Sequence, residues 1–144
     1  MKKLIYLGMI AFMAVFFIVP AYAAHGTENK GTQGLIAPQF TYISSLSSGL
    51  SINSSGRAAC AGFASAYNSS HTTKLTVELQ KSSGSVWSTI KSWSASSTGT
   101  SAAVVEENYY VVRGTYRVCA TAKVYNASGG LLETQSLYSY TSTY

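Results

Sequence analysis

The sequence predicts an all-β fold, a single β-sandwich of about seven antiparallel strands that follows an N-terminal signal helix. Short runs such as 75–80 and 116–125 alternate apolar and polar residues, which is the period of a half-buried strand. Clusters of Gly, Asn and Ser separate these runs at nearly regular intervals. Of the 121 residues after Ala23, 37 are Ser or Thr and only 22 are Leu, Ile, Val or Phe. Such a thin core, completed by Tyr and Trp, favours a small β domain over a helical bundle.

Residues 1–23 have the layout of a secretory signal peptide. Lys2 and Lys3 precede an apolar run of 16 residues (4–19), then a proline and a small-x-small sequence that ends at Ala23. The run is shorter than the roughly 20 residues that span a membrane core, so a membrane anchor is the weaker interpretation. We expect cleavage between Ala23 and Ala24 and a secreted, extracellular protein that has no membrane contact after cleavage.

The mature chain is expected to begin with a polar, Gly-rich linker over residues 24–38. The β-sandwich domain then covers residues 39–144. Its predicted strands are 40–52, 57–67, 75–80, 86–95, 102–112, 116–125 and 131–140. Seven short strands in about 105 residues are typical of an immunoglobulin or fibronectin type III sandwich.

Each predicted strand has its own sequence signal. Serines interrupt the first strand, the second is rich in Ala, and a Ser-Ser-Gly-Ser turn at 82–85 joins the third and fourth into a hairpin. A bend at 106–108 divides the fifth strand, and the sixth follows Gly114. The Asn-Ala-Ser-Gly-Gly sequence at 126–130 is the strongest turn signal and precedes the seventh strand.

Three groups of residues resemble a known family. They are the segment 42–52, the segment 79–81 with Trp87 and Trp93, and the segments 116–118 and 124–126. Together they resemble a family of small exported proteins of unknown function from Gram-positive bacteria. The resemblance covers nearly the whole mature chain and implies a secreted bacterial β domain, but it implies no catalytic residue.

Cys60 and Cys119 are the only cysteines, and an exported chain enters a compartment that permits disulfides. They lie in the second and sixth predicted strands, which the inter-sheet bridge of immunoglobulin domains joins, so we expect a Cys60–Cys119 disulfide. In immunoglobulin domains a tyrosine lies two residues before the second bridge cysteine, but here Tyr116 lies three residues before Cys119. Strict alternation then puts Cys119 on the polar face with Arg117. Either a bulge shifts the strand, or the two thiols point away from the core and stay free.

The fourth predicted strand contains the candidate binding residues. Trp87, Thr89, Lys91 and Trp93 alternate, so we expect them on one face of that strand. Two Trp about 13 Å apart could form a platform for sugar rings or other flat ligands. The alternative is that both Trp cover the thin core.

The sequence contains few residues that could carry out catalysis or bind a metal ion. The mature chain has no Asp that could pair with His25 or His71, and we expect both histidines at the surface. Glu106 and Glu107 are adjacent, so on a strand they point to opposite faces. No nucleophile-elbow motif or metal-ligand spacing is present. We therefore expect no catalytic residue, no metal and no cofactor.

The charge pattern bears on partners. After signal removal eight Lys and Arg face five Glu, and the basic residues are dispersed singly along the chain. Dispersed charges do not predict nucleic-acid binding, which usually needs a clustered basic face, although attraction to anionic cell-wall polymers is compatible with them. We expect a non-catalytic binding module that acts at the cell envelope or at a host or environmental surface. Its partner would be a cell-wall or glycan polymer, or a surface protein. The alternatives are a small secreted glycan or cell-wall hydrolase and a self-assembling structural protein.

Overall fold

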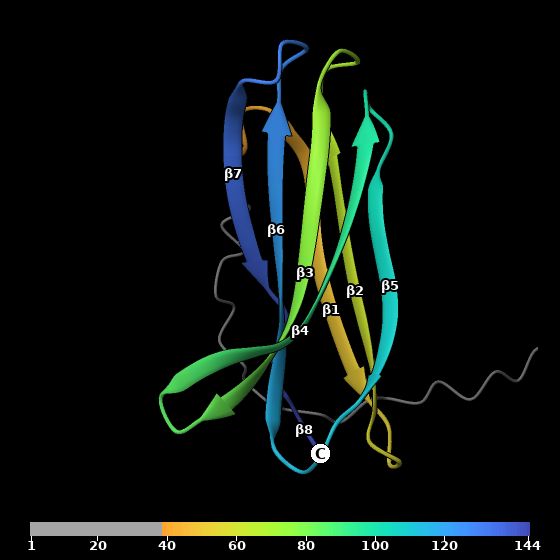
Figure 1. The fold of residues 1–144 in the computed structure, drawn as a ribbon, viewed down its shortest axis with the longest axis vertical. Helices are drawn as coiled ribbons and strands as arrows, with labels where there is room; N and C mark the ends of the chain where they lie inside the picture. The colour runs from red at the N-terminus through yellow and green to blue at the C-terminus, as the bar shows by residue number, and fades with distance from the viewer. Residues whose placement is uncertain (1–38) are drawn as a thin grey trace, which may run out of the picture. The chain divides into compact units, whose positions relative to one another are not determined.

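The computed structural model describes residues 39–144, which form eight β-strands and no helix (Figure 1). The strands are β1 (Ile43–Ile52), β2 (Arg57–Ala66), β3 (Thr72–Ser83), β4 (Val86–Thr98), β5 (Ala103–Tyr110), β6 (Thr115–Tyr125), β7 (Leu131–Tyr138) and β8 (Ser142–Thr143). The seven longer strands match the seven predicted segments, which confirms the all-β class. The expected signal peptide, its cleavage site and the linker 24–38 lie outside the described residues. No helix within residues 39–144 is long and apolar enough to cross a membrane.

The strands form two antiparallel sheets that lie one over the other (Figure 1). Sheet A has the order β1-β2-β5, and sheet B has the order β4-β3-β6-β7, with β8 paired to the start of β6. The β1–β2, β3–β4 and β6–β7 connections stay within one sheet. The other connections between the seven longer strands cross from sheet to sheet, so the chain closes both layers around one core.

The core lies between the sheets and is built from alternate residues of the central strands. On β6 the inward residues are Tyr116, Val118, Ala120, Ala122 and Val124, each at most 1% exposed. These residues are small or β-branched apart from Tyr116, which agrees with the thin core that the composition predicted. The sheets therefore approach closely.

Gly62 on β2 lies where the two sheets approach closely. A Cβ atom added there would overlap the Cγ2 atom of Val77 on β3 and would lie 3.6 Å from the Cβ atom of Ala120 on β6. Because only a hydrogen occupies this position, β2 can pack directly onto the centre of sheet B.

The β5–β6 connection is held by a buried tyrosine. Tyr116 is 1% exposed, and its hydroxyl donates a hydrogen bond of 2.6 Å to the carbonyl oxygen of Val112, four residues upstream. A buried phenol needs such a partner, and this one ties the start of β6 to the loop that precedes it.

Glu133 on β7 anchors the start of the domain. Its carboxylate accepts hydrogen bonds from the backbone N–H groups of Thr41 (3.2 Å), Tyr42 (2.7 Å) and Ile43 (3.0 Å). Partial burial opposes ionisation of this carboxyl, but the three backbone donors and the Gln135 amide outweigh it, and the pKa of Glu133 lies below its usual value. The charged form therefore stabilises the contact between the entry to β1 and β7.

Candidate functional site

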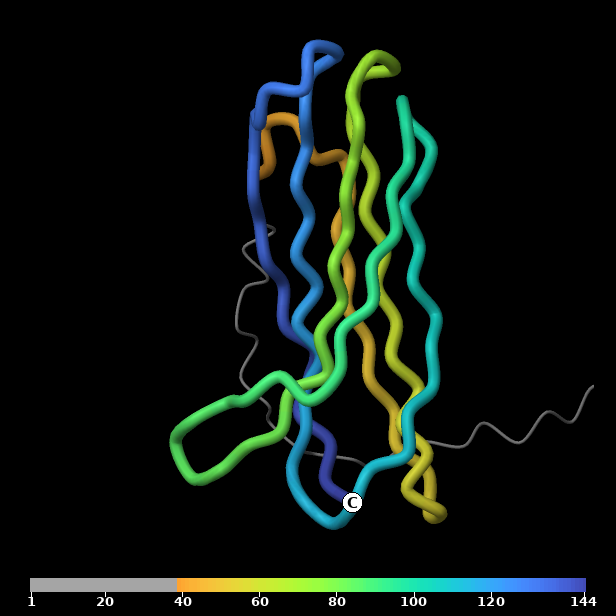
Figure 2. The backbone as a smooth tube through the Cα atoms, in the orientation of Figure 1, coloured from red at the N-terminus to blue at the C-terminus, as the bar shows by residue number. Residues whose placement is uncertain are grey.

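The predicted tryptophan strand is interrupted by a β-bulge. Leu79 pairs with Lys91 and the next residue, Gln80, pairs with Thr89, so Ile90 is an extra residue in β4. Paired residues of adjacent strands share a face, and one extra residue exchanges the faces beyond it. The expectation that Trp87, Thr89, Lys91 and Trp93 lie on one face is therefore wrong. The hairpin also bends here, and Figure 2 shows its tip leaving the direction of the other strands.

The two tryptophans consequently have different surroundings. Trp93 pairs with buried Val77 and packs against the core, which agrees with the core-covering alternative for this residue. Lys91 pairs with buried Leu79 and points to the same side of sheet B as Trp93. Trp87 lies on the opposite side, the outer face of sheet B, together with Thr89.

Trp87 takes part in a stacked cluster on this outer face. The guanidinium carbon of Arg117 lies 4.3 Å from the ring centroid of Trp87 and 4.0 Å from that of Tyr138. The Nε–H group of Arg117 donates a 2.9 Å hydrogen bond to Oε1 of Gln80. The cation is thus held in one orientation between two aromatic rings, and Tyr138 remains 52% exposed.

The same face contains two further cations that the sheet register brings together. Lys74 on β3 pairs directly with Lys123 on β6, and both are exposed. Their row continues to Ser96 on β4 and Thr134 on β7, so it contains no carboxylate. The ammonium of Lys74 also lies 5.0 Å from the ring centroid of Tyr125. We call the outer face of sheet B, from Tyr125 and Lys74 to Arg117 and Trp87, the basic face.

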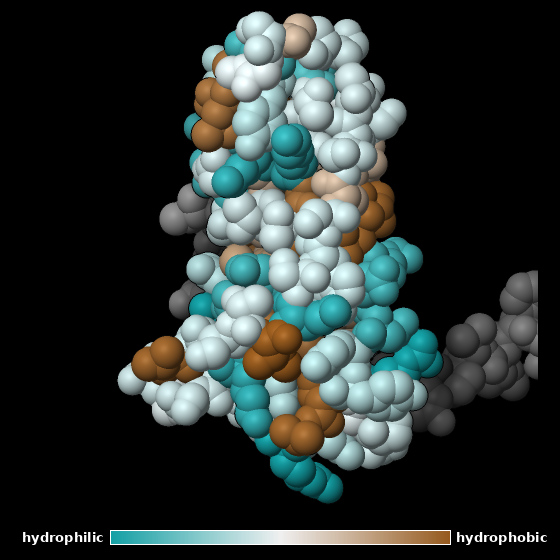
Figure 3. Space-filling model, in the orientation of Figure 1, coloured by the Kyte–Doolittle hydropathy of each residue, from teal (hydrophilic) through white to brown (hydrophobic). Residues whose placement is uncertain are grey.

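Hydroxyl groups fill the middle of the basic face. One row consists of Ser94, Thr76, Thr121 and Ser136, and the last two hydroxyls are 2.8 Å apart. A hollow of about 360 Å³ opens over β3 and β4 and is lined by Lys74, Leu75, Thr76, Ser94, Ala95 and Ser96. Figure 3 shows that most of this face is polar, with separate apolar patches such as the one at the hairpin tip.

The two cysteines do not form the expected bridge. Both are free and buried. Only Cys119 points away from the core, whereas Cys60 points into it. Cys60 lies in the core between the sheets, where burial raises the pKa of its thiol to about 11. Cys119 lies on the outer side of sheet B, and its Sγ atom is 3.8 Å from Oγ1 of Thr121. No bulge shifts β6 between Tyr116 and Val124, so the alternation that puts Cys119 with Arg117 holds and the disulfide prediction is wrong.

Val118, and not Cys119, takes the core position across from Cys60. Gly62 faces Ala120, and β2 and β6 run in the same direction (Figure 1). Two residues earlier on each strand, this alignment places Cys60 opposite buried Val118.

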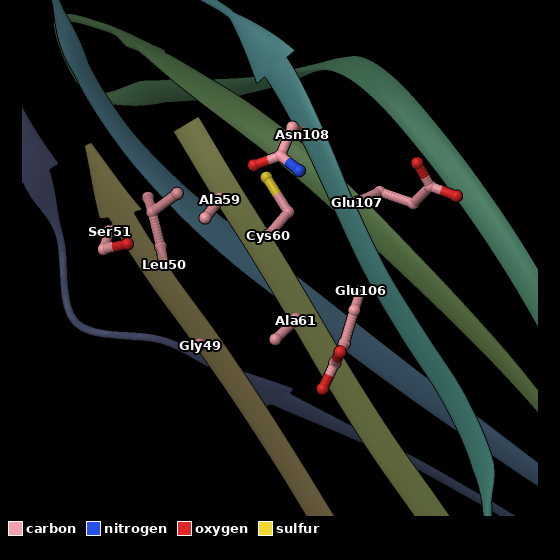
Figure 4. Close-up of a pocket in the computed structure, with 9 residues that line it drawn as sticks. All are labelled: Gly49, Leu50, Ser51, Ala59, Cys60, Ala61, Glu106, Glu107 and Asn108. Atoms are coloured by element: carbon pink, nitrogen blue, oxygen red, sulfur yellow. The ribbon is translucent and has the colours of Figure 1, made fainter. Parts of the chain in front are cut away.

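A second hollow, of about 530 Å³, lies over sheet A (Figure 4). Its floor consists of small residues, with Gly49 and Ser51 on β1 beside Ala59 and Ala61 on β2. The side chains of Glu106 and Glu107 border it on β5 and point in different directions (Figure 4). The hollow thus contains no pair of converging carboxylates.

His71 lies apart from both hollows. It is 9% exposed, and its ring meets that of Tyr42 edge-on with centroids 5.7 Å apart. It is therefore a buried residue and not a surface one, while His25 lies outside the described residues. In residues 39–144, no three His, Cys, Asp or Glu side chains are arranged to hold a metal ion.

Sequence reasoning missed the pairing of Lys74 with Lys123. The two residues are 49 positions apart, and only the β3–β6 register puts them side by side. The alternation of Lys74, Thr76, Glu78 and Gln80 marks them as one face of a strand, but the sequence does not identify the partner strand. A scan against protein-family models and a search of curated proteins found no match to this chain.

Proposed function

We propose that this protein is an exported, non-catalytic binding module that recognises anionic, hydroxyl-rich polymers through the basic face. The observation that carries the proposal is the direct opposition of Lys74 and Lys123 in a row without a carboxylate. Like charges directly opposite on a sheet cost up to about 1 kcal/mol. An anionic ligand would relieve that repulsion, so the arrangement favours a bound anion.

The shape and chemistry of the basic face support an extended ligand. The face follows β3 from Thr72 to Ser82, a length of about 33 Å at the usual rise of a strand. Its hydroxyl rows offer both donors and acceptors to the hydroxyl groups of a polymer. The Trp87–Arg117–Tyr138 stack adds a cation and aromatic rings, on which flat rings can pack. An open surface of this kind fits a chain that lies across it better than a small molecule that needs an enclosed pocket.

The strand order supports a sandwich of the immunoglobulin or fibronectin type III class as the scaffold. Three strands (β1-β2-β5) pack on four (β4-β3-β6-β7), and Tyr116 bonds back to Val112 as the tyrosine corner of that class does. Val118 then occupies the position that the second bridge cysteine takes in antibody domains, two residues after the corner tyrosine. Such sandwiches present broad sheet faces and loops for recognition.

The distribution of carboxylates supports a role in binding and not in hydrolysis. A glycosidase needs two carboxylates that flank one bond, at separations of about 5 to 9.5 Å. Glu78 is the one carboxylate in the ladder rows of the basic face within residues 39–144. Glu133 is engaged by three backbone donors, and Glu106 and Glu107 diverge. The signal peptide that the sequence predicts over residues 1–23 supports export, and hence a site of action at the envelope or at an external surface.

Binding to immobilised polymers tests the proposal. Dextran sulfate and a polyol phosphate polymer are the anionic probes, and unsulfated dextran is the neutral control. We expect the anionic probes to bind and the neutral one not to, with affinity that falls as salt rises because bound counterions are released. Binding confined to single-stranded DNA, or equal binding to unsulfated dextran, would overturn the proposal.

A matched set of variants locates the binding surface. The double variant Lys74→Gln with Lys123→Gln should weaken binding to dextran sulfate about tenfold or more and reduce its salt dependence. Lys91→Gln with Arg57→Gln also removes two positive charges, one from the other side of sheet B and one from β2 of sheet A. It is the control, for which we expect little change. Equal losses in both proteins would show that net charge, and not the basic face, drives binding. Cleavage of any probe during the incubation would contradict the non-catalytic assignment.

A further inference from the structure

Strand β1 forms an edge of sheet A, and from Ser45 onward it lacks the features that usually protect such edges. Its one register shift lies before this stretch, between Ile43 and Ser45. It pairs only with β2, so one side of its backbone has no strand partner among the described residues. The whole stretch from residue 39 to residue 56 contains no charged residue. Edge strands commonly avoid pairing with other chains by means of charges, prolines or bulges. From Ser45 to Ile52, β1 pairs with β2 without a bulge and contains none of the three.

The other three edges of the two sheets do carry such protection. β4 has Lys91 and the bulge at Ile90, β5 has Glu106 and Glu107, and β7 has Glu133. The contrast within one molecule indicates that β1 is left open selectively. An open edge of this kind can pair with the same edge of a second copy of the protein.

The sequence of β1 is complementary to itself in one antiparallel register. If two copies of β1 pair about Ser48, the half-buried Leu46 of each copy faces Leu50 of the other on the inner side. On the outer side Ser47 faces Gly49, and Ser45 faces Ser51. Apolar residues then meet apolar residues, small residues meet small residues, and no charge is buried.

We propose that two copies of this protein pair through their β1 edges into a symmetric dimer with a continuous six-stranded sheet. An antiparallel strand pair of identical chains has its two-fold axis perpendicular to the sheet, so the interface is isologous and closes at two copies. The seam is short and buries less than the roughly 1,600 Å² of a standard interface, so the dimer is a weak one.

This geometry has a consequence for ligand binding that rests on the proposed function, whereas the dimer itself does not. Because the axis is perpendicular to the sheets, the two basic faces point to the same side of the dimer. A polymer bound to one basic face would be held close to the other, so its binding to the second face becomes intramolecular. This raises the apparent affinity for the polymer without any new kind of contact.

Two double variants at Ser45 and Ser51 test the register directly. Both side chains are exposed on the outer face of β1, and six positions separate them within one chain. In the proposed dimer, Ser45→Lys with Ser51→Glu places two opposite-charge pairs across the seam. Ser45→Lys with Ser51→Lys places two like-charge pairs there. We expect the Lys/Glu variant to dimerise at least about tenfold more tightly than the Lys/Lys variant, with the wild type between them.

Sedimentation velocity of the protein in the form that cells produce, from about 1 μM to about 1 mM, measures the dissociation constants. Ser54→Lys, which adds a charge in the exposed β1–β2 turn, is the control and should behave as the wild type does. A wild type that is monomeric throughout this range, or equal constants for the two double variants, would overturn the proposal. Dextran sulfate binding by a monomeric Lys/Lys variant separates the two proposals, because its basic face is unaltered.

Discussion

Gly62 offers the most direct test of the close approach between the sheets. In Gly62→Ala the new methyl group would overlap Cγ2 of Val77 and would lie 3.5 Å from Cδ2 of Leu75 and 3.6 Å from Cβ of Ala120. Val77 has no exposed surface and belongs to β3, which is paired on both sides, so it cannot move aside without shifting the sheet. Overpacking of this kind costs about 1–3 kcal/mol.

The net effect is smaller, because alanine restricts the unfolded chain more than glycine does. That restriction returns about 0.4–1 kcal/mol, so we expect a loss of about 1–2 kcal/mol in the free energy of unfolding. For a domain of this size, such a loss lowers Tm by about 5–10 °C. Thermal melts followed by circular dichroism, with urea unfolding for the free energy, measure both quantities.

The neighbouring strand provides a matched control. In Gly49→Ala the new Cβ atom would lie 3.7 Å from Cβ of Ala61, an ordinary van der Waals contact. We expect this variant to match or slightly exceed the wild type in Tm. Equal Tm values for Gly62→Ala and Gly49→Ala would refute the argument that the sheets meet at Gly62.

Three further predictions follow from side-chain environments. Trp93→Ala should lower the free energy of unfolding by about 2–3 kcal/mol, because it removes a partly buried core contact. Trp87→Ala should lower it by about 1 kcal/mol or less, because it removes only the stack on Arg117. The reverse ranking in thermal melts would refute the conclusion that the bulge puts the two tryptophans on different faces. Glu133→Gln should cost about 1 kcal/mol at pH 7, a value reduced for solvent screening. Because the pKa of Glu133 is lowered in the folded state, this stabilisation is fully present above the usual Glu pKa of about 4.3 and is lost as the pH falls through the folded pKa. The Tm values of the variant and the wild type should therefore become equal in acid. Val118→Cys should form a disulfide with Cys60 under oxidising conditions and stabilise the folded state by about 4 kcal/mol in the chain-entropy model. If both core thiols can still be alkylated in the oxidised protein, the alignment of β2 with β6 is wrong.

Much of the fold could be predicted from local patterns. Alternation within single strands and Gly-rich turns identified all seven longer strands, because the two-residue period and the turn conformations depend on neighbours in the chain. The alternation of β6 also placed Cys119 with Arg117, away from the core. The disulfide was expected by analogy with immunoglobulin domains. The strand period, which depends only on backbone geometry, correctly predicted the side of β6 on which Cys119 lies.

The bulge at Ile90 shows where local patterns fail. The alternation of Trp87, Thr89, Lys91 and Trp93 is regular in the sequence, yet the β3–β4 register shifts at Gln80 and separates the tryptophans. A bulge depends on how two strands twist and pair, and nothing in β4 alone marks the extra residue.

The strands, the turns and the thin core could be predicted from the sequence alone, because they depend on composition and on residues close together in the chain. The packing of the two sheets was needed to show that Lys74 meets Lys123, that Arg117 lies between Trp87 and Tyr138, and that β1 is an edge strand. Strand order and register join residues tens of positions apart, and they are set by how both sheets bury their inner faces together. The faces on which we base the proposed functions are therefore products of packing, which no single segment of the chain encodes.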